Sequence, residues 1–176
     1  MDEFGIKIRQ LSTHHTHTMK EASQITLEIC ALIDKWVPKL TFLPEKTISE
    51  PRNSQHRNIK QILGHLIDST SNNTHRVVHL QYQDSPFSFP NYATFGNNDR
   101  WIEIQNYESA DWINLIQLWK YSLLHYCHVI NNVIDQKLEN EWISGPEKNI
   151  TLHSMIVDFP KHVKLHLDEI NDLIKS

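Results

Sequence analysis

Two histidines one helical turn apart near the C-terminus, His162 and His166, are the residues of this chain best placed to do chemistry. They stand in the run Asp158-Phe-Pro-Lys-His-Val-Lys-Leu-His-Leu-Asp-Glu-Ile. Apolar residues recur around them at helical spacing, and a stripe of this kind faces a protein core. Buried imidazoles need polar partners, because an unsatisfied polar group is costly to bury. A divalent metal ion is one such partner, since neutral imidazole is a common metal ligand.

A third histidine, His65, borders the apolar face of a second helical pattern. Three histidines from two helices match the ligand set of an open zinc site, in which a fourth position is left for water or substrate. Histidine pairs at this spacing also arise by chance, so the spacing alone slightly favours ordinary hydrogen-bonded, partly buried histidines. On the residues alone, both interpretations stay open.

Polar residues continue the side of the helix on which His65 lies: Asp68, Ser69, Asn72 and Arg76. This stripe fits either a solvated surface or a polar pocket beside the core. In a pocket, Asp68 would be a hydrogen-bond partner for a metal-bound imidazole. Asn72 and Arg76 would hold an anionic cofactor, since arginine suits carboxylates.

The remaining histidines are assigned to packing or to the surface. His125 and His128 lie three residues apart, but their aromatic surroundings favour ordinary packing over a metal role. Three more histidines fall in the polar leader at residues 1–18, which we predict to be disordered and exclude from the site. Residues 19–176 then form one domain, which is an ordinary domain length.

Helical periodicity predicts an all-α fold with no strands. Pro38 is expected to end the first helix, and Pro160 to kink or break the last one just before His162. Between the second and third helices lies a long connection, for which Trp101 is the expected anchor. The four predicted helices span 20–37, 59–82, 109–136 and 151–175, an arrangement that suggests a four-helix bundle.

Composition excludes several classes of protein. The chain has 176 residues, a net charge of -4 and a pI near 6.3, which argues against a nucleic-acid-binding protein. Its two cysteines make no disulfide framework and fit a reducing cytoplasm. No apolar run is long enough to span a membrane.

Several segments resemble the DinB/YfiT-like superfamily of metal-dependent enzymes. The most specific are Gly64-His-Leu-Ile-Asp and the terminal His-x-x-x-His motif, and the stretch from Trp101 to Trp119 is similar as well. The resemblance runs from about Met19 to the C-terminus. Many relatives carry a histidine doublet at the end of the last motif, and here Leu165 replaces its first member.

The resemblance implies a fold, a metal site and a reaction class. The fold is an up-down-down-up four-helix bundle, often a homodimer. One divalent ion per chain, zinc or nickel, is held by His65, His162 and His166. The implied activity is thiol S-transfer with a bacillithiol-like low-molecular-weight thiol, or hydrolysis, acting on small molecules.

Two other functions remain as alternatives to the enzyme. A non-catalytic, stress-associated metal- or ligand-binding dimer would have a closed or metal-free site. A purely structural bundle would bind no metal tightly. The enzyme instead requires an open coordination position beside a pocket that contains Asp68, Asn72 and Arg76.

Overall fold

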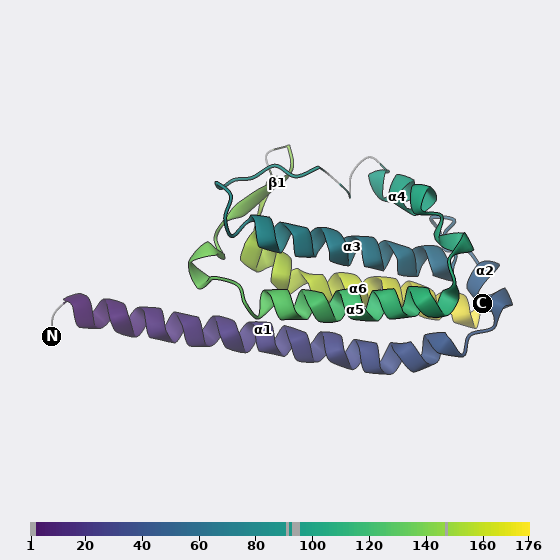
Figure 1. Ribbon diagram of the computed structural model, residues 1–176, viewed down its shortest axis with the longest axis horizontal. Helices are drawn as coiled ribbons and strands as arrows, with labels where there is room; N and C mark the ends of the chain where they lie inside the picture. The colour runs from purple at the N-terminus through teal and green to yellow at the C-terminus, as the bar shows by residue number, and fades with distance from the viewer. Residues whose placement is uncertain (1–2, 91, 93–95, 147) are drawn as a thin grey trace.

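Four long helices form the bundle: α1 (Glu3–Thr41), α3 (Ile59–His79), α5 (Trp112–Ile130) and α6 (Leu152–Lys175). The computed structural model describes residues 3–90, 92, 96–146 and 148–176, with side chains from residue 21 onward. Helices α1 and α6 run in one direction, whereas α3 and α5 run in the other (Figure 1). The order is therefore up, down, down, up, as predicted, and the parallel pair α3 and α5 requires a crossover along the bundle.

The core lies between the four helices. Helix α3 packs against α5 and α6, and α1 packs against the same two helices from the other side. Each helix contributes a stripe of buried apolar side chains, which is what helical periodicity requires. Among the described residues, no helix combines the length and apolarity that a membrane span needs. Fully buried members of the core include Ile29, Leu63, Leu66, Trp119 and Val163.

Side-chain caps determine where three of the helices begin. Asn58 accepts a hydrogen bond from the backbone N–H of Gln61, whose side chain accepts from the Asn58 N–H in return, which completes a capping box before α3. Asp111 caps α5, and Thr151 caps α6 through the backbone N–H of Ser154. These caps place His65 two turns into α3 and fix its position along the helix.

Pro38 does not end its helix as predicted, and Pro160 does not break α6. Pro38 lies inside α1 and does not end it, because Trp36 and Leu40 are buried on either side. The Trp112 indole also donates to the Leu40 carbonyl at 2.9 Å, which holds the last turn. Pro160 lies within the unbroken helix α6, so no break separates it from the terminal histidines. In both places tertiary burial outweighs the lost backbone hydrogen bond.

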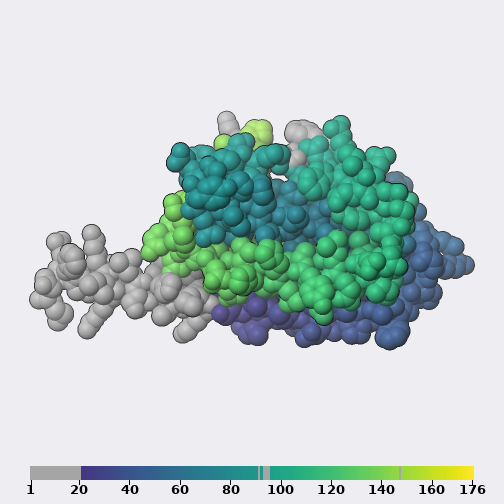
Figure 2. Space-filling view, viewed as in Figure 1, coloured from purple at the N-terminus to yellow at the C-terminus, as the bar shows by residue number. Residues whose placement is uncertain are grey.

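The crossover between α3 and α5 lies along α3 and contains two short helices, α4 (Asn97–Gln105) and η1 (Tyr107–Ser109) (Figure 1). Figure 2 shows it as two lobes of surface, the loop after α3 and the α4 region, with a hollow between them. The expected anchor, Trp101, remains 41% exposed. Ile102 and Tyr107 are buried in its place, because their side chains face α3.

A small hairpin departs from the all-helical prediction. Strand β1 (Glu141–Gly145) pairs antiparallel with β2 (Lys148–Thr151) just before α6. Phe87 from the crossover adds backbone hydrogen bonds to β1, at 2.9 and 3.0 Å. Strands of four or five residues are too short to show a clear alternation, and this pairing depends on a distant segment. The other short helices are α2 (Glu45–Ser49) and η2 (Asp135–Lys137).

Candidate metal centre

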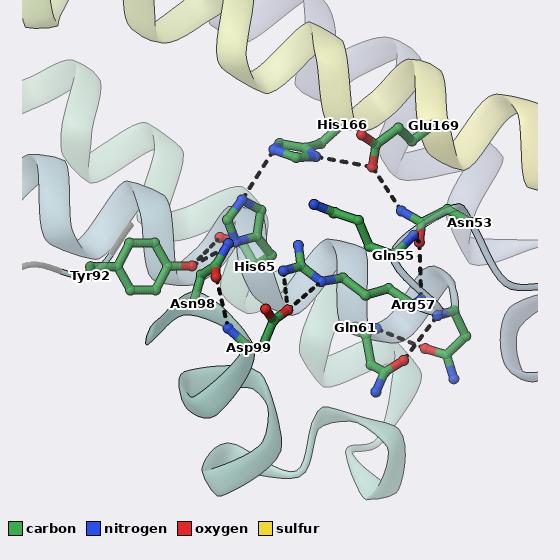
Figure 3. Close-up of polar contacts among 11 residues, drawn as sticks. Asn53, Gln55, Arg57, Gln61, His65, Tyr92, Asn98, Asp99, His166 and Glu169 are labelled. Carbon is green, nitrogen blue, oxygen red and sulfur yellow. Dashed lines mark hydrogen bonds and ion pairs between the residues drawn. The ribbon is translucent and has the colours of Figure 1, made fainter. Parts of the chain in front are cut away.

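The structure brings His65 of α3 together with His162 and His166 of α6. We call these residues the three-histidine cluster. One ring nitrogen from each lies within 4.8 Å of the others, and the Nε2 atoms of His65 and His166 are 3.1 Å apart (Figure 3). The i, i+4 spacing on α6 turns both of its imidazoles toward α3. Among the described residues, no other group of three potential metal ligands converges in this way.

Burial keeps the imidazoles of His65 and His162 neutral near pH 7. His65 is 5% exposed and His166 is 7% exposed, while His162 is half-buried. Burial lowers the pKa of His65 to about 2, assisted by the two neighbouring imidazoles and Arg57. Burial, followed by the proximity of His166, lowers the pKa of His162 to about 4. Near neutral pH both rings therefore have a lone pair available for a ligand.

The second ring nitrogens of two histidines have partners of their own. His65 Nδ1 lies 2.7 Å from the Tyr92 hydroxyl, and His166 Nδ1 lies 3.2 Å from Glu169 Oε2. Burial raises the pKa of Tyr92, so its hydroxyl stays protonated. Asn53 donates to the same Glu169 oxygen at 3.1 Å (Figure 3). Such contacts orient a ligating imidazole and fix its tautomer.

This donor set fits a divalent metal ion. Tetrahedral zinc with Zn–N bonds of about 2.0–2.1 Å separates its nitrogen ligands by roughly 3.3 Å. The observed 3.1 Å between His65 and His166 is close to that separation. With both Nδ1 atoms engaged, the Nε2 atoms are left for the ion. For the third imidazole, His162, the Nε2 atom lies 3.1 Å from the Ser69 hydroxyl.

A cavity of about 230 Å³ opens beside the cluster, and we call it the histidine cavity. His65 and His162 form part of its wall, together with polar groups from α3. The wall opposite α3 is mostly apolar and comes from β2 and the first turns of α6. The remaining lining residues are Ser69, Asn73, Arg76, Tyr92, Ile150, Ser154, Met155, Asp158 and Phe159.

The three pocket residues suggested by the sequence lie in different surroundings. Arg76 lines the histidine cavity. Asn72 lines a second, outer cavity of about 310 Å³ and donates to the Asp68 carbonyl at 2.9 Å. The Asp68 carboxylate accepts from Tyr107 and Gln105, both at 2.7 Å, and thus binds the crossover to α3. The groups that contact the imidazoles are instead Tyr92 and Glu169.

Sequence reasoning missed both of these partners. Glu169 follows His166 by three residues, a spacing at which side chains on a helix meet, so the pattern held a signal for it. Tyr92 lies 27 residues beyond His65, in the crossover, where no periodicity applies. The alternative pair on α5, His125 and His128, is exposed, with ring centroids 6.5 Å apart.

The fold defines a class: an up-down-down-up four-helix bundle with a histidine cluster between its second and fourth long helices. A solved structure with a similar fold is YfiT from Bacillus subtilis, described as a probable metal-dependent hydrolase with an unusual four-helix bundle topology. The likeness has a TM-score of 0.69 at 16% identity and covers 91% of this chain and 85% of that one. It confirms the predicted fold. No family model and no curated protein matches the chain.

Proposed function

We propose that this chain is a divalent-metal-dependent enzyme that acts on small molecules, with the three-histidine cluster as its metal site. The observation that carries the proposal is the convergence of three imidazoles on the wall of a cavity. A bound divalent ion would supply positive charge that acidifies a water or thiol. All-imidazole ligation suits zinc or nickel.

The chain's own residues have distinct roles in this proposal. Tyr92 and Glu169 hold the rings of His65 and His166 in the orientation that presents Nε2. The apolar wall of the histidine cavity excludes water around a substrate and strengthens electrostatic contacts there. An ordinary packed core would instead leave no cavity beside its imidazoles.

Hydrolysis is the first candidate reaction. YfiT is described as a "probable metal-dependent hydrolase", and an acidified water needs no further reactant. Transfer from a low-molecular-weight thiol uses the same metal and is the second candidate. A homodimer is part of the same proposal, since α5 leaves Ile113, Leu118 and Tyr121 exposed for a partner copy.

Metal content tests this proposal. The parent chain, a His65→Ala/His162→Ala/His166→Ala variant and a His125→Ala/His128→Ala variant would be loaded with zinc or nickel, dialysed and analysed for metal. All three proteins keep the leader histidines, so adventitious binding there is common to them. We expect about one ion per chain in the parent and the α5 variant, and none above background in the triple variant. Equal metal in all three proteins would refute the site.

Reaction class is tested on the metal-loaded parent. Ester and amide substrates would be assayed without thiol, and electrophilic aryl halides with and without added cysteine or glutathione. Turnover that needs no thiol and disappears with the triple variant supports hydrolysis. Turnover only with thiol supports transfer. If the metal-loaded protein turned over neither class, the non-catalytic binding dimer would be favoured.

A further inference from the structure

Arg76 is a buried cation with an incomplete set of partners. It is 6% exposed, and its Nη2 atom has no hydrogen-bond partner. Its other terminal nitrogen makes one long contact, 3.5 Å to Asn73 Oδ1. The guanidinium stacks on the Trp142 ring at 4.2 Å, which orients the plane but offers no acceptor. Within the described part of the chain, no carboxylate forms an ion pair with Arg76.

The position of this guanidinium connects it to the three-histidine cluster. Arg76 lines the histidine cavity and also the outer cavity, so it stands between the two. His65, Ser69, Asn73 and Arg76 follow one another along one side of α3. An offset of eleven positions along α3 separates the Cα atoms of His65 and Arg76 by about 16 Å. Both side chains lean toward the N-terminus, and the longer Arg76 side chain reaches further in that direction, which shortens the gap between the two polar groups.

The surroundings of Arg76 favour an anionic ligand. An unpaired buried charge is costly, and a planar carboxylate offers the two acceptors that a guanidinium fork matches. The one carboxylate that lines the histidine cavity, Asp158, is exposed and already pairs with Lys161 at 3.0 Å. Opposite α3, the cavity wall includes the apolar side chains of Met155, Phe159 and Ile150. Ser69 and Asn73 line the α3 side between His65 and Arg76.

We propose that Arg76 binds the carboxylate of a small, apolar carboxylic acid whose other end faces the three-histidine cluster. This inference rests on the proposed function and specifies its substrate class. The acid group would give Arg76 the acceptor that it lacks, while the apolar middle contacts the wall opposite α3. The guanidinium thereby orients the substrate without taking part in the chemical step.

Matched acids and amides test the proposal. Benzoate, phenylacetate and hydrocinnamate would be titrated calorimetrically, each beside its primary amide, into zinc-loaded and metal-free protein. We expect at least one acid of the series to bind at least about tenfold more tightly than its amide, with or without zinc. Arg76→Gln should abolish that preference, and Arg76→Lys should retain part of it. Arg100→Gln, which removes an exposed cation from α4, should retain all of it.

Thermal unfolding separates a binding role from a structural one. Removing an unpaired buried charge should leave the melting temperature of Arg76→Gln equal to that of the parent or above it. A lower melting temperature together with an unchanged acid preference would assign Arg76 to stability and overturn the proposal. So would equal binding of acid and amide to the parent, or no binding of either across the series.

The same measurements distinguish this inference from the proposed function. An acid preference that appears only with zinc and survives Arg76→Gln would place the carboxylate on the metal. That result would overturn the role proposed for Arg76 but leave the proposed metal site standing. A chain that binds no zinc would refute the metal site. An Arg76-dependent acid preference in that metal-free chain would leave a carboxylate-binding bundle.

Discussion

Two sides of α3 carry buried polar residues, and they differ in what those residues contact. On the side toward α6, His65 and Ser69 meet the imidazoles of His166 and His162 beside a cavity. On the side toward the crossover, Asp68 accepts from Tyr107 and Gln105. The polar residues on both sides are buried, since His65 is 5% exposed and Asp68 is 2% exposed. Burial of polar groups alone therefore does not identify a functional site.

The difference lies in where the lone pairs and donors converge. Tyr107 and Gln105 donate to one Asp68 oxygen, and neither cavity described above is lined by Asp68. On the other side, ring nitrogens from α3 and α6 face one another beside a cavity, and Arg76 Nη2 has no hydrogen-bond partner. One side holds the crossover in place, whereas the other carries the groups to which we assign the proposed metal ion and carboxylate.

The largest effect should follow from removing one member of the three-histidine cluster. His166→Ala removes the ring nitrogen 3.1 Å from His65 and leaves two ligands. Competition with a chromogenic zinc chelator should show that stoichiometric tight binding is lost. His128→Ala on α5 removes an exposed imidazole and should bind zinc as the parent does. Tight binding in His166→Ala would contradict the assigned ligand set.

A tenfold to hundredfold loss of zinc affinity is expected for Glu169→Gln, because the amide no longer holds His166 Nδ1–H as a carboxylate does. The same competition assay measures it. Asp168→Asn provides the control, since Asp168 is the exposed neighbour on the outer face of α6. Equal affinities in the two variants would show that Glu169 does not orient the ring.

On the crossover side, the expected effect is on stability. A methyl group at Gly64 would lie 2.1 Å from Cδ2 of Tyr107, so Gly64→Ala must displace the ring that donates to Asp68. We expect the free energy of unfolding to fall by about 1–3 kcal/mol in urea titrations. Gly145→Ala is the matched control, because nothing lies within 4 Å of the added carbon. A stable Gly64→Ala would mean that the crossover moves freely over α3.

The pH dependence of the metal-free protein distinguishes the two sides further. The pKa values of His65 and His162 are lowered from 6.5 to about 2 and about 4, so below pH 6.5 the unfolded chain binds more protons than the folded one. Stability should therefore fall as the pH drops from 6.5 to about 4. The triple alanine variant should show a shallower fall. If the stability of the parent and of the triple variant fell in parallel with pH, these imidazoles would be protonated in the folded protein.

The smallest effect is expected for Asp68→Asn. The amide keeps an acceptor oxygen for Tyr107 and removes a carboxyl whose pKa burial has raised. Zinc affinity should be unchanged, and the free energy of unfolding should change by less than about 1 kcal/mol. A marked loss of zinc would instead restore Asp68 to the metal centre, where the sequence stripe had placed it.

Periodicity predicted the four helices, one shared face for His162 and His166, and the place of His65 beside an apolar stripe. The resemblance, rather than the spacing, implied that the three histidines meet and gave the order of the helices. The four-helix topology is confirmed. Tyr92 could not be placed, because a contact made from a long crossover leaves no spacing signal. Trp142, which contacts Arg76, lies on strand β1 of a short hairpin, and Phe87 of the crossover pairs with that strand. The spacing of residues gave no signal for either contact.

The parallel arrangement of α3 and α5 obliges the chain to return over its own surface, and that return segment supplies Tyr92 to the site. The architecture therefore separates two tasks. Helices α3 and α6 carry the three histidines, while a segment without regular periodicity supplies Tyr92, which contacts one of them. A substitution in the return segment can therefore alter the surroundings of His65 while the helices that carry the histidines stay the same.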